Sequence, residues 1–267
     1  MKFSIITISY NQGNYLEQCI KSVLNQKYSN IEHIVIDNIS TDETYEILKK
    51  YKLKDKRFKY IRQKDKGPAD ALNKGFSIAN GDIFYFLNSD DYLIKNSLNL
   101  VHQYFKKKKK IDILLAAGFK KIENTKKKIY VCSSKPNLNS YLLGISTFFQ
   151  QGMFFTKKIY KQFGPFNIKN KISWDGELYV NFLFNKVRIV RVFDPVAIFR
   201  IQNLAITSQK NYLIKYQKYK KKIISKYLKK KFYIFRDSKK ILFFIKLIFD
   251  PKYFIFKFLY FINFFKK

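Results

Sequence analysis

The chain has 267 residues and a mass of 32.1 kDa, which predicts one large domain or one domain with an appendage, and its hydrophobic fraction of 47% is ample for a buried core. Its two cysteines, Cys19 and Cys132, lie far apart and lack metal-binding spacing, which argues against a disulfide framework or a zinc site and fits a reducing compartment. The formal net charge of +34 allows a nucleic-acid-binding protein, but the sequence shows neither an RRM nor a helix-turn-helix pattern.

The amino-terminal segment "MKFSIITISY" reads as a short strand and not as a signal peptide, because no long apolar run follows its charged residue. The β-branched run at 3–9 therefore predicts the first strand. A helix is expected from about Asn14, where Asn14 and Glu17 would form a capping box. Its apolar stripe comprises Leu16, Ile20, Val23 and Leu24, with Cys19 as a small core residue.

A second strand is predicted at 31–37, and His33 within it is interpreted as a surface residue of the strand. Ser40 and Glu43 are expected to cap a helix that follows. A third strand is predicted at 58–63. Pro68 suits the first turn of the next helix, which should end near residues 80–81, and the apolar run at 82–88 predicts a fourth strand buried in a parallel sheet.

This alternation predicts an α/β fold with a doubly wound, mostly parallel sheet flanked by helices. Ligands of such sheets bind beyond the carboxyl ends of the strands. Polar residues gather at three of these ends, namely Thr7, Ser9 and Tyr10, then Asp37, and finally Asp90 with Asp91. Neither GxGxxG nor GxxxxGK[ST] occurs, so the sequence predicts neither a dinucleotide fingerprint nor a P-loop.

The adjacent carboxylates of Asp90 and Asp91 follow a run of large apolar residues, "FYFLN". Such a pair repels itself in an apolar setting unless a divalent cation lies nearby, and otherwise both side chains should face water in a turn. Their convergence with polar groups from two other strands favours a ligand site.

Four segments together resemble the family 2 glycosyltransferases, which are nucleotide-sugar-dependent enzymes with the GT-A fold. The segments are "ITISYNQGNYLEQCIKSVLNQ", "VIDNISTDET", "DKGPADALNKGFSIANGDIFYFLNSDDYL" and "QQGMFFTKKIYKQFGPFN…SWDGELYVNFLF". They stand in the family's order and span residues 3–200, and the first three are highly specific in combination.

The resemblance implies a binding site for a nucleotide sugar, with a UDP-sugar as the expected donor. Tyr10 would lie near the base, Asp37 would accept a hydrogen bond from the base, and Asp90 would face the ribose. The full set implied to bind the donor is Thr7, Ser9, Tyr10, Asp37, Asp70, Asn73 and Asp90.

The resemblance also implies that Asp91 binds the Mg²⁺ or Mn²⁺ that bridges the diphosphate, and that Asp175 is the catalytic base. A hard cation can neutralise the departing diphosphate. One base without a protein nucleophile leads to inversion at the anomeric carbon. Glu177 is the rival for the base, and Trp174 should either stack on a sugar face or pack in the core.

Two stretches depart from the family pattern. Ile39 stands where Gly or Asn is common. In a segment that resembles the family's Arg-x-His, Gln202 or Asn203 stands near the usual histidine, while Arg200 is retained and is expected to contact the diphosphate.

A catalytic domain is predicted at 1–206, with a nucleotide-binding half at 1–100 and an acceptor-side half at 101–206. The remainder, 207–267, is a basic, aromatic, amphipathic helical tail with 18 basic and two acidic residues. Its uncharged runs are too short to span a bilayer, so the tail is expected to lie on anionic lipid. The alternative is a pair of helices that packs on the catalytic domain.

These features predict an inverting, metal-dependent glycosyltransferase that transfers a sugar to a glycan or lipid-linked glycan acceptor in bacterial surface polysaccharide biosynthesis. We expect it in the cytoplasm, peripheral on the inner face of the plasma membrane, without a nucleic-acid partner. One alternative is a sugar nucleotidyltransferase, although "SYNQGNY" is not the Gly-rich, basic loop that such an enzyme needs. The other is a non-enzymatic nucleic-acid-binding protein, which would not depend on Asp90 or Asp91.

Overall fold

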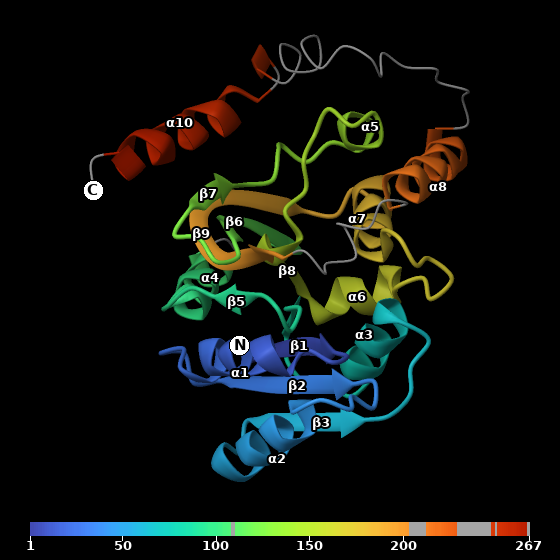
Figure 1. The fold of residues 1–267 in the computed structure, drawn as a ribbon. Helices are drawn as coiled ribbons and strands as arrows, with labels where there is room; N and C mark the ends of the chain where they lie inside the picture. Colours follow the sequence, from blue (N-terminus) through green and yellow to red (C-terminus); the bar gives the residue numbers. More distant parts are fainter. Residues whose placement is uncertain (108–109, 203–211, 229–246, 249, 266–267) are drawn as a thin grey trace.

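The structure, a computed structural model, describes residues 1–107, 110–202, 212–228, 247–248 and 250–265 (Figure 1). A nine-stranded sheet has the order β3-β2-β1-β4-β8-β6-β9-β5, and β7 pairs with β6 outside this path. The strands are β1 (Phe3–Ser9), β2 (Ile31–Asp37), β3 (Phe58–Arg62), β4 (Ile83–Phe86), β5 (Tyr92–Leu93), β6 (Ile113–Ile122), β7 (Lys128–Val131), β8 (Met153–Thr156) and β9 (Ile189–Ile201). The helices are α1 (Gly13–Leu24), α2 (Thr44–Lys54), α3 (Pro68–Ser77), α4 (Ser97–Lys107), α5 (Leu138–Leu142), the 3₁₀ turn η1 (Gln150–Gly152), α6 (Lys157–Phe163), α7 (Trp174–Phe184), α8 (Tyr212–Leu228) and α10 (Pro251–Phe265).

The first four strands of this order, β3, β2, β1 and β4, pair in parallel, so their carboxyl ends meet at one edge of the sheet. Beyond β4 the direction changes, because β8 runs antiparallel to both β4 and β6, while β9 runs parallel to β6. The predicted α/β class is confirmed, with a parallel first half and a mixed second half.

Helices cover both faces of the sheet because successive side chains of a strand point to opposite faces. Phe3 and Ile5 of β1 pack with α1, α2 and α4, whereas Ile6 packs with α3 on the other face. The predicted apolar stripe of α1, including Cys19, is buried in the first of these clusters.

His33 is fully buried, so its interpretation as a strand-surface residue is wrong. Its Nε2 lies 2.9 Å from Thr7 Oγ1, and its ring meets Phe58 edge-on at 5.6 Å. Burial lowers the pKa of His33 to about 3, so the ring is neutral at physiological pH. An inner strand that is covered on both faces buries polar and apolar positions alike, and His33 is accommodated because Thr7 supplies a hydrogen-bonding partner.

The two predicted helix caps are also wrong. The helix α1 begins at Gly13 and α2 at Thr44. The side chain of neither N-cap residue accepts a hydrogen bond from the backbone of its helix. Asp42 serves both helices instead, because its Oδ2 accepts the Gly13 N–H at 2.9 Å and its Oδ1 accepts the Thr44 N–H at 3.1 Å. A carboxylate near two positive helix ends is electrostatically favourable.

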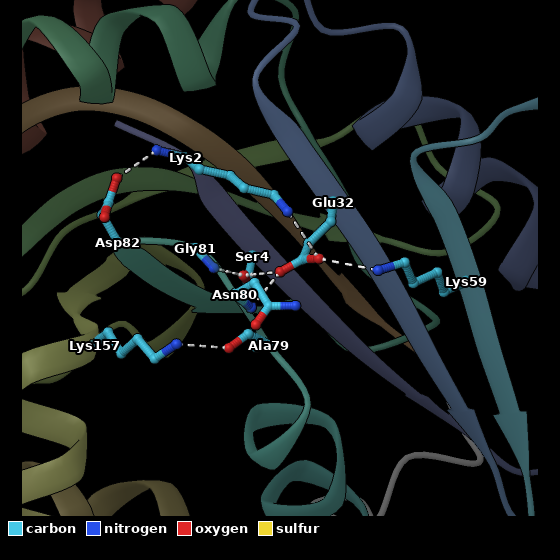
Figure 2. A network of polar contacts seen from close by, with 9 residues as sticks. All are labelled: Lys2, Ser4, Glu32, Lys59, Ala79, Asn80, Gly81, Asp82 and Lys157. Atoms are coloured by element: carbon cyan, nitrogen blue, oxygen red, sulfur yellow. Dashed lines mark hydrogen bonds and ion pairs between the residues drawn. The ribbon is translucent and has the colours of Figure 1, made fainter.

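The opposite, amino-terminal edge of the sheet is held by the buried carboxylate of Glu32 (Figure 2). Lys2 Nζ donates to it at 3.0 Å, Ser4 Oγ at 2.5 Å and the Asn80 backbone N–H at 2.6 Å. Removing one partner of such a buried carboxylate lowers the stability of the folded state. The network therefore ties β1 and β2 to the loop before β4 and fixes where β4 begins.

The two C-terminal helices pack on the rest of the molecule. Ile223 of α8 is buried with residues of α5 and α7. Phe256 of α10 stacks on Phe193 of β9 at 4.0 Å, and just before α10 the buried Asp250 pairs with Arg191 at 2.5 Å. This agrees with the alternative of helices that pack on the catalytic domain, while residues 229–246 of the tail lie outside the described residues. The division at residue 206 stays a prediction.

Among the residues described, none of the helices has the length and apolar character of a membrane span.

Candidate active site

The carboxyl ends of β1, β2 and β4 bring together most of the predicted polar residues. Ser9, the last residue of β1, is the direct register partner of Asp37, the last residue of β2. The chain continues from β4 through Asn88 into a turn in which the Asp91 N–H donates to the Asn88 carbonyl at 3.0 Å. Asp90 and Asp91 thus lie at the same edge as Ser9 and Asp37.

Asp91 is almost completely buried, and both of its carboxylate oxygens already have protein donors. Its Oδ1 accepts the Arg200 backbone N–H at 2.9 Å, and its Oδ2 accepts the Gln151 amide at 2.9 Å. Burial, and then the charge of Asp90, raise the pKa of Asp91 well above its usual range. Asp91 therefore joins β9 and η1 to the end of β4.

Asp90 is only partly buried, and one oxygen accepts a hydrogen bond from the Gln202 side-chain amide at 2.7 Å. Burial raises the pKa of this carboxyl as well. Of the two carboxylates, Asp90 is the one with a side open to solvent and hence to a ligand.

Arg200 lies across the same turn. Its Nε donates to the Asp90 carbonyl at 2.9 Å, and its guanidinium packs between the rings of Tyr15 and Tyr92 at 4.7 and 5.5 Å. A second nitrogen of the guanidinium donates to Gln18 Oε1. These contacts hold a permanent positive charge beside the carboxylate pair, where an anionic ligand would approach.

The loop after β2 folds back over Asp37, which is fully buried. The carboxylate of Asp37 accepts the Ser40 N–H at 3.1 Å and the Ser40 hydroxyl, and it pairs with Arg62 at 3.3 Å. Ile39 between them has φ +53°, a left-handed conformation that is rare for a β-branched residue. The turn therefore directs Ser40 onto Asp37 with backbone strain at Ile39.

Two buried polar atoms of the β1–α1 connection have no hydrogen-bonding partner among the described residues. They are the hydroxyl of Ser9 and the side-chain carbonyl oxygen of Gln12. An unsatisfied buried polar group costs about 1–3 kcal/mol, so such groups gather where a ligand supplies the missing partner. Next to them, Tyr10 exposes 58% of its surface, as a ring that receives a ligand would.

The other predicted donor residues are engaged in the protein itself. Thr7 is fully buried and bonded to His33. Asp70 accepts the Lys66 N–H at 2.9 Å and pairs with Lys74 at 3.2 Å. Asn73 accepts from the Tyr160 hydroxyl and from the Phe166 N–H, each at 2.9 Å, so it holds the segment after β8 against α3.

The structure distinguishes the two acidic residues in the first turn of α7. Glu177 accepts hydrogen bonds from the Asn170 and Asn167 side chains at 2.8 and 3.1 Å, which hold the preceding loop. Asp175 is half-buried, and no side chain of the described residues donates to its carboxylate. Burial raises the pKa of Asp175. Glu177 thus holds the preceding loop, whereas the Asp175 carboxylate has no side-chain donor among the described residues.

Trp174 links this helix to the strand edge. Its ring packs on Phe86, the last residue of β4, and on Phe166, with ring centroids 5.4 Å apart in both cases. The packing interpretation of Trp174 thus agrees with the structure, and it places the amino-terminal end of α7 beside the turn that carries Asp90.

Among the described residues, no three His, Cys, Asp or Glu side chains form a cluster that could hold a metal ion by themselves. Mg²⁺ in phosphate-transfer sites is commonly bound through one or two carboxylates together with substrate phosphates and water. Asp90 is partly open and lies next to the buried Asp91, so it fits such a shared site.

Two residues of the site were missed from the sequence, Gln151 and Ser40. Gln151 reaches Asp91 from η1, and the "QQG" that begins the fourth matching segment was the available signal. Ser40 was assigned to a helix cap, and only the fold brings its hydroxyl to Asp37.

Residues 4–164 match the family described as Glycosyl transferase family 2. The chain is similar to glycosyltransferase GlyG of Streptococcus pneumoniae, with 36% identity over 106 residues that make up 39% of this chain and 35% of that protein. It is also similar to the putative glycosyltransferase EpsH of Bacillus subtilis, with 36% identity over 90 residues, or 34% of this chain and 26% of that protein. The chain thus matches about a third of the length of these relatives or less.

Two solved structures share the fold. The S. aureus TarS 1–349 structure in complex with UDP-GlcNAc has a TM-score of 0.64 at 22% identity, over 85% of this chain and 72% of that chain. The mannosyltransferase PcManGT of Pyrobaculum calidifontis, in complex with GDP-Man and Mn²⁺, has a TM-score of 0.56 at 15% identity, over 76% and 58%. The expected fold class and the resemblance stated from the sequence are confirmed.

The strain at Ile39 generates a stability prediction. Replacing Ile39 with Asn, which tolerates the left-handed region, should stabilise the fold by about 1 kcal/mol and raise the melting temperature by about 2–4 °C. Ile39→Val keeps the β-branch and the strain, and it should show no gain. Thermal unfolding followed by circular dichroism compares the three proteins, and equal or lower stability of Ile39→Asn relative to Ile39→Val would refute the strain.

Proposed function

Because the chain belongs to glycosyl transferase family 2, we propose that it transfers a sugar from a nucleotide-diphosphate donor, with a UDP-sugar as the expected donor, to a glycan or lipid-linked glycan acceptor. The observation that carries this proposal is the Asp90–Asp91 pair at the end of β4, next to the unpartnered Ser9 hydroxyl of the β1–α1 connection. The UDP-GlcNAc and UDP in the TarS complexes support a nucleotide-sugar donor. Bacterial surface polysaccharide biosynthesis is the setting that we propose, and the relatives named above are glycosyltransferases of bacteria.

In the proposed donor site, the exposed ring of Tyr10 packs on the base. The Ser9 hydroxyl, which has no partner within the described part of the chain, gains a hydrogen bond from the donor. Asp37 accepts a base N–H when the Ser40 hydroxyl turns away from it. Each of the remaining predicted donor residues is hydrogen-bonded to other protein groups, so these residues hold the site in place without contacting the donor. They are Thr7, Asp70 and Asn73.

We assign the divalent cation to Asp90, in place of the ligation by Asp91 that we expected. Asp91 is buried and its oxygens are occupied, so it positions the turn, while Asp90 has an open side. A bound Mg²⁺ or Mn²⁺ supplies positive charge for the departing diphosphate. The Mn²⁺ in the PcManGT complex supports a divalent cation. Arg200 adds a fixed positive charge on the same side.

Asp175 serves as the base in this proposal. The acceptor oxygen forms a bond to the anomeric carbon and gives its proton to Asp175, while the bond from the anomeric carbon to the phosphate oxygen breaks and its electron pair leaves with the diphosphate. Attack opposite the leaving group inverts the anomeric configuration. Burial raises the pKa of Asp175 toward the operating pH, which makes a carboxylate a more effective base.

The assignment of the base is tested by a matched pair of variants. Asp175→Asn should lower transfer by about 10²- to 10⁴-fold with donor binding retained, because a positioned base contributes this much. Glu177→Gln should retain the acidic limb of the pH–rate profile, whereas Asp175→Asn should lose it. Rates of UDP release, measured for both variants across a range of pH, show which of the two carboxylates is the base. An inactive Glu177→Gln beside an active Asp175→Asn would reverse the roles.

We propose that the protein is peripheral on the inner face of the plasma membrane, held there by α10. One side of this helix packs on the protein through Tyr253 and Phe256. The other side exposes Ile255 and Phe258, at 53% and 63%. Lys252 and Lys257 of the same helix are exposed as well, and Lys257 Nζ lies 5.4 Å from the centroid of the Tyr253 ring. Apolar insertion combined with basic residues is typical of helices that lie on anionic lipid.

Vesicle sedimentation tests this attachment. The wild-type protein should bind vesicles that contain phosphatidylglycerol and bind less as salt rises, because part of the attraction is electrostatic. Replacing Ile255 and Phe258 with Ser should remove most of the binding. Leu53→Ser is the matched control, since Leu53 exposes 90% of its surface on α2, and it should bind like the wild type. Equal binding by the double variant and the control would contradict the proposal.

A further inference from the structure

The helices α5, α7 and α8 are neighbours in the fold (Figure 1). A narrow cleft lies between them, beside the end of α7 that carries Asp175. The residues that line it include Tyr141, Ser173, Glu177, Tyr216, Tyr219 and Lys220. The cleft encloses about 20 Å³, the room that a single water molecule requires. A sugar ring would therefore rest across its mouth, and only a small group would enter.

Aromatic rings from α8 face the proposed base at this point. The Tyr212 hydroxyl donates to the Ile172 carbonyl at 3.3 Å, and the rings of Tyr212 and Tyr216 stack with centroids 6.0 Å apart. Burial, followed by the nearby charge of Asp175, raises the pKa of Tyr216. A tyrosine offers a flat apolar face with a polar tip, and both complement a sugar ring.

Lys220 lies one helical turn after Tyr216, on the same side of α8, and it lines the same cleft. Its side chain is half-buried, and burial lowers its pKa. Neither an ion pair nor a hydrogen bond to its ammonium is found within the described part of the chain. The ammonium lies against Gly144, where φ is +77° and an added Cβ would be 2.6 Å from Nζ.

A half-buried ammonium without a partner among the described residues distinguishes the cleft from an ordinary lysine-rich surface. Desolvating an ammonium without a partner is unfavourable, and a bound anion removes the cost. The chain as a whole carries 53 basic and 19 acidic residues, so it attracts anionic ligands over a distance. The helix α8 also lies beyond residues 4–164, the part of the chain that the family has in common, as expected for an element that sets acceptor specificity.

We propose that this cleft is an acceptor subsite for an anionic glycan, with a sugar ring packed against Tyr216 and the phosphate or carboxylate group of the acceptor at Lys220. The inference rests on the proposed function, and it narrows the acceptor from glycans in general to glycans that carry negative charge close to the reacting sugar.

Titration calorimetry with three simple sugars tests the proposal at 150 mM NaCl, where long-range attraction is largely screened. Glucose 6-phosphate, glucuronate and glucose differ in the group that Lys220 would bind. The wild type should bind one of the two anionic sugars at least tenfold more tightly than glucose, and the better ligand identifies phosphate or carboxylate. Lys220→Met should lose this preference. Lys221→Met, a change of the next and exposed residue, should keep it.

Equal binding of the three sugars by the wild type would overturn the proposal, and so would equal losses in Lys220→Met and Lys221→Met. Thermal unfolding verifies that each variant is folded, and Lys220→Gln replaces Lys220→Met if the latter is not. Release of nucleoside diphosphate from a panel of nucleotide sugars is measured on the same wild-type sample. Release without any preference for anionic sugars rejects the subsite alone, whereas absence of release from every donor counts against the proposed function.

Discussion

Two neighbouring carboxylates, Asp90 and Asp91, lie in the turn after β4, a strand of buried aromatic and aliphatic side chains. Burial raises the pKa of both, and the charge of Asp90 raises that of Asp91 further. A carboxyl whose pKa is raised in the folded state contributes stability at low pH that is lost as the pH rises through this pKa, so the pair weakens the fold near neutral pH. The protein tolerates this because donors from β9 and η1 satisfy Asp91, and a cation at Asp90 would recover more of the lost stability.

The rest of the molecule holds this arrangement in place from several sides. At the amino-terminal edge, Glu32 fixes the start of β4 and thereby the position of its other end. Trp174 packs on Phe86 and brings the amino-terminal end of α7, with Asp175, to the same edge. The proposed base and the carboxylate pair thus come from segments about 85 residues apart and are joined by aromatic packing. In turn, α8 covers the far side of α7 and gives the proposed acceptor site its tyrosines and Lys220.

The sequence was sufficient for the order of the strands and helices through β4, because each element there is a compact run of apolar residues with a clear period. It also located Ser9, Asp90 and Asp175, which follow strands or begin a helix within recognisable segments. It could not give the partners of these residues. His33, Asp42 and Glu32 look like surface residues along the chain, and only tertiary packing shows that they bond to β1, α1 and the loop before β4 respectively. The relative exposure of Asp90 and Asp91 is likewise set by Gln151 and Arg200, which are remote in sequence.

The central claim is that the carboxylate pair binds a nucleoside diphosphate through a divalent cation. Calorimetric titration of UDP into the wild-type protein and into Asp90→Asn, each with Mn²⁺ and with EDTA, tests it most directly. The account predicts that wild-type binding is much tighter with Mn²⁺ than with EDTA, and that Asp90→Asn loses this dependence because the ligand of the cation is gone. UDP binding by the wild type that is equally tight with Mn²⁺ and with EDTA, or an undiminished Mn²⁺ dependence in Asp90→Asn, would contradict the account.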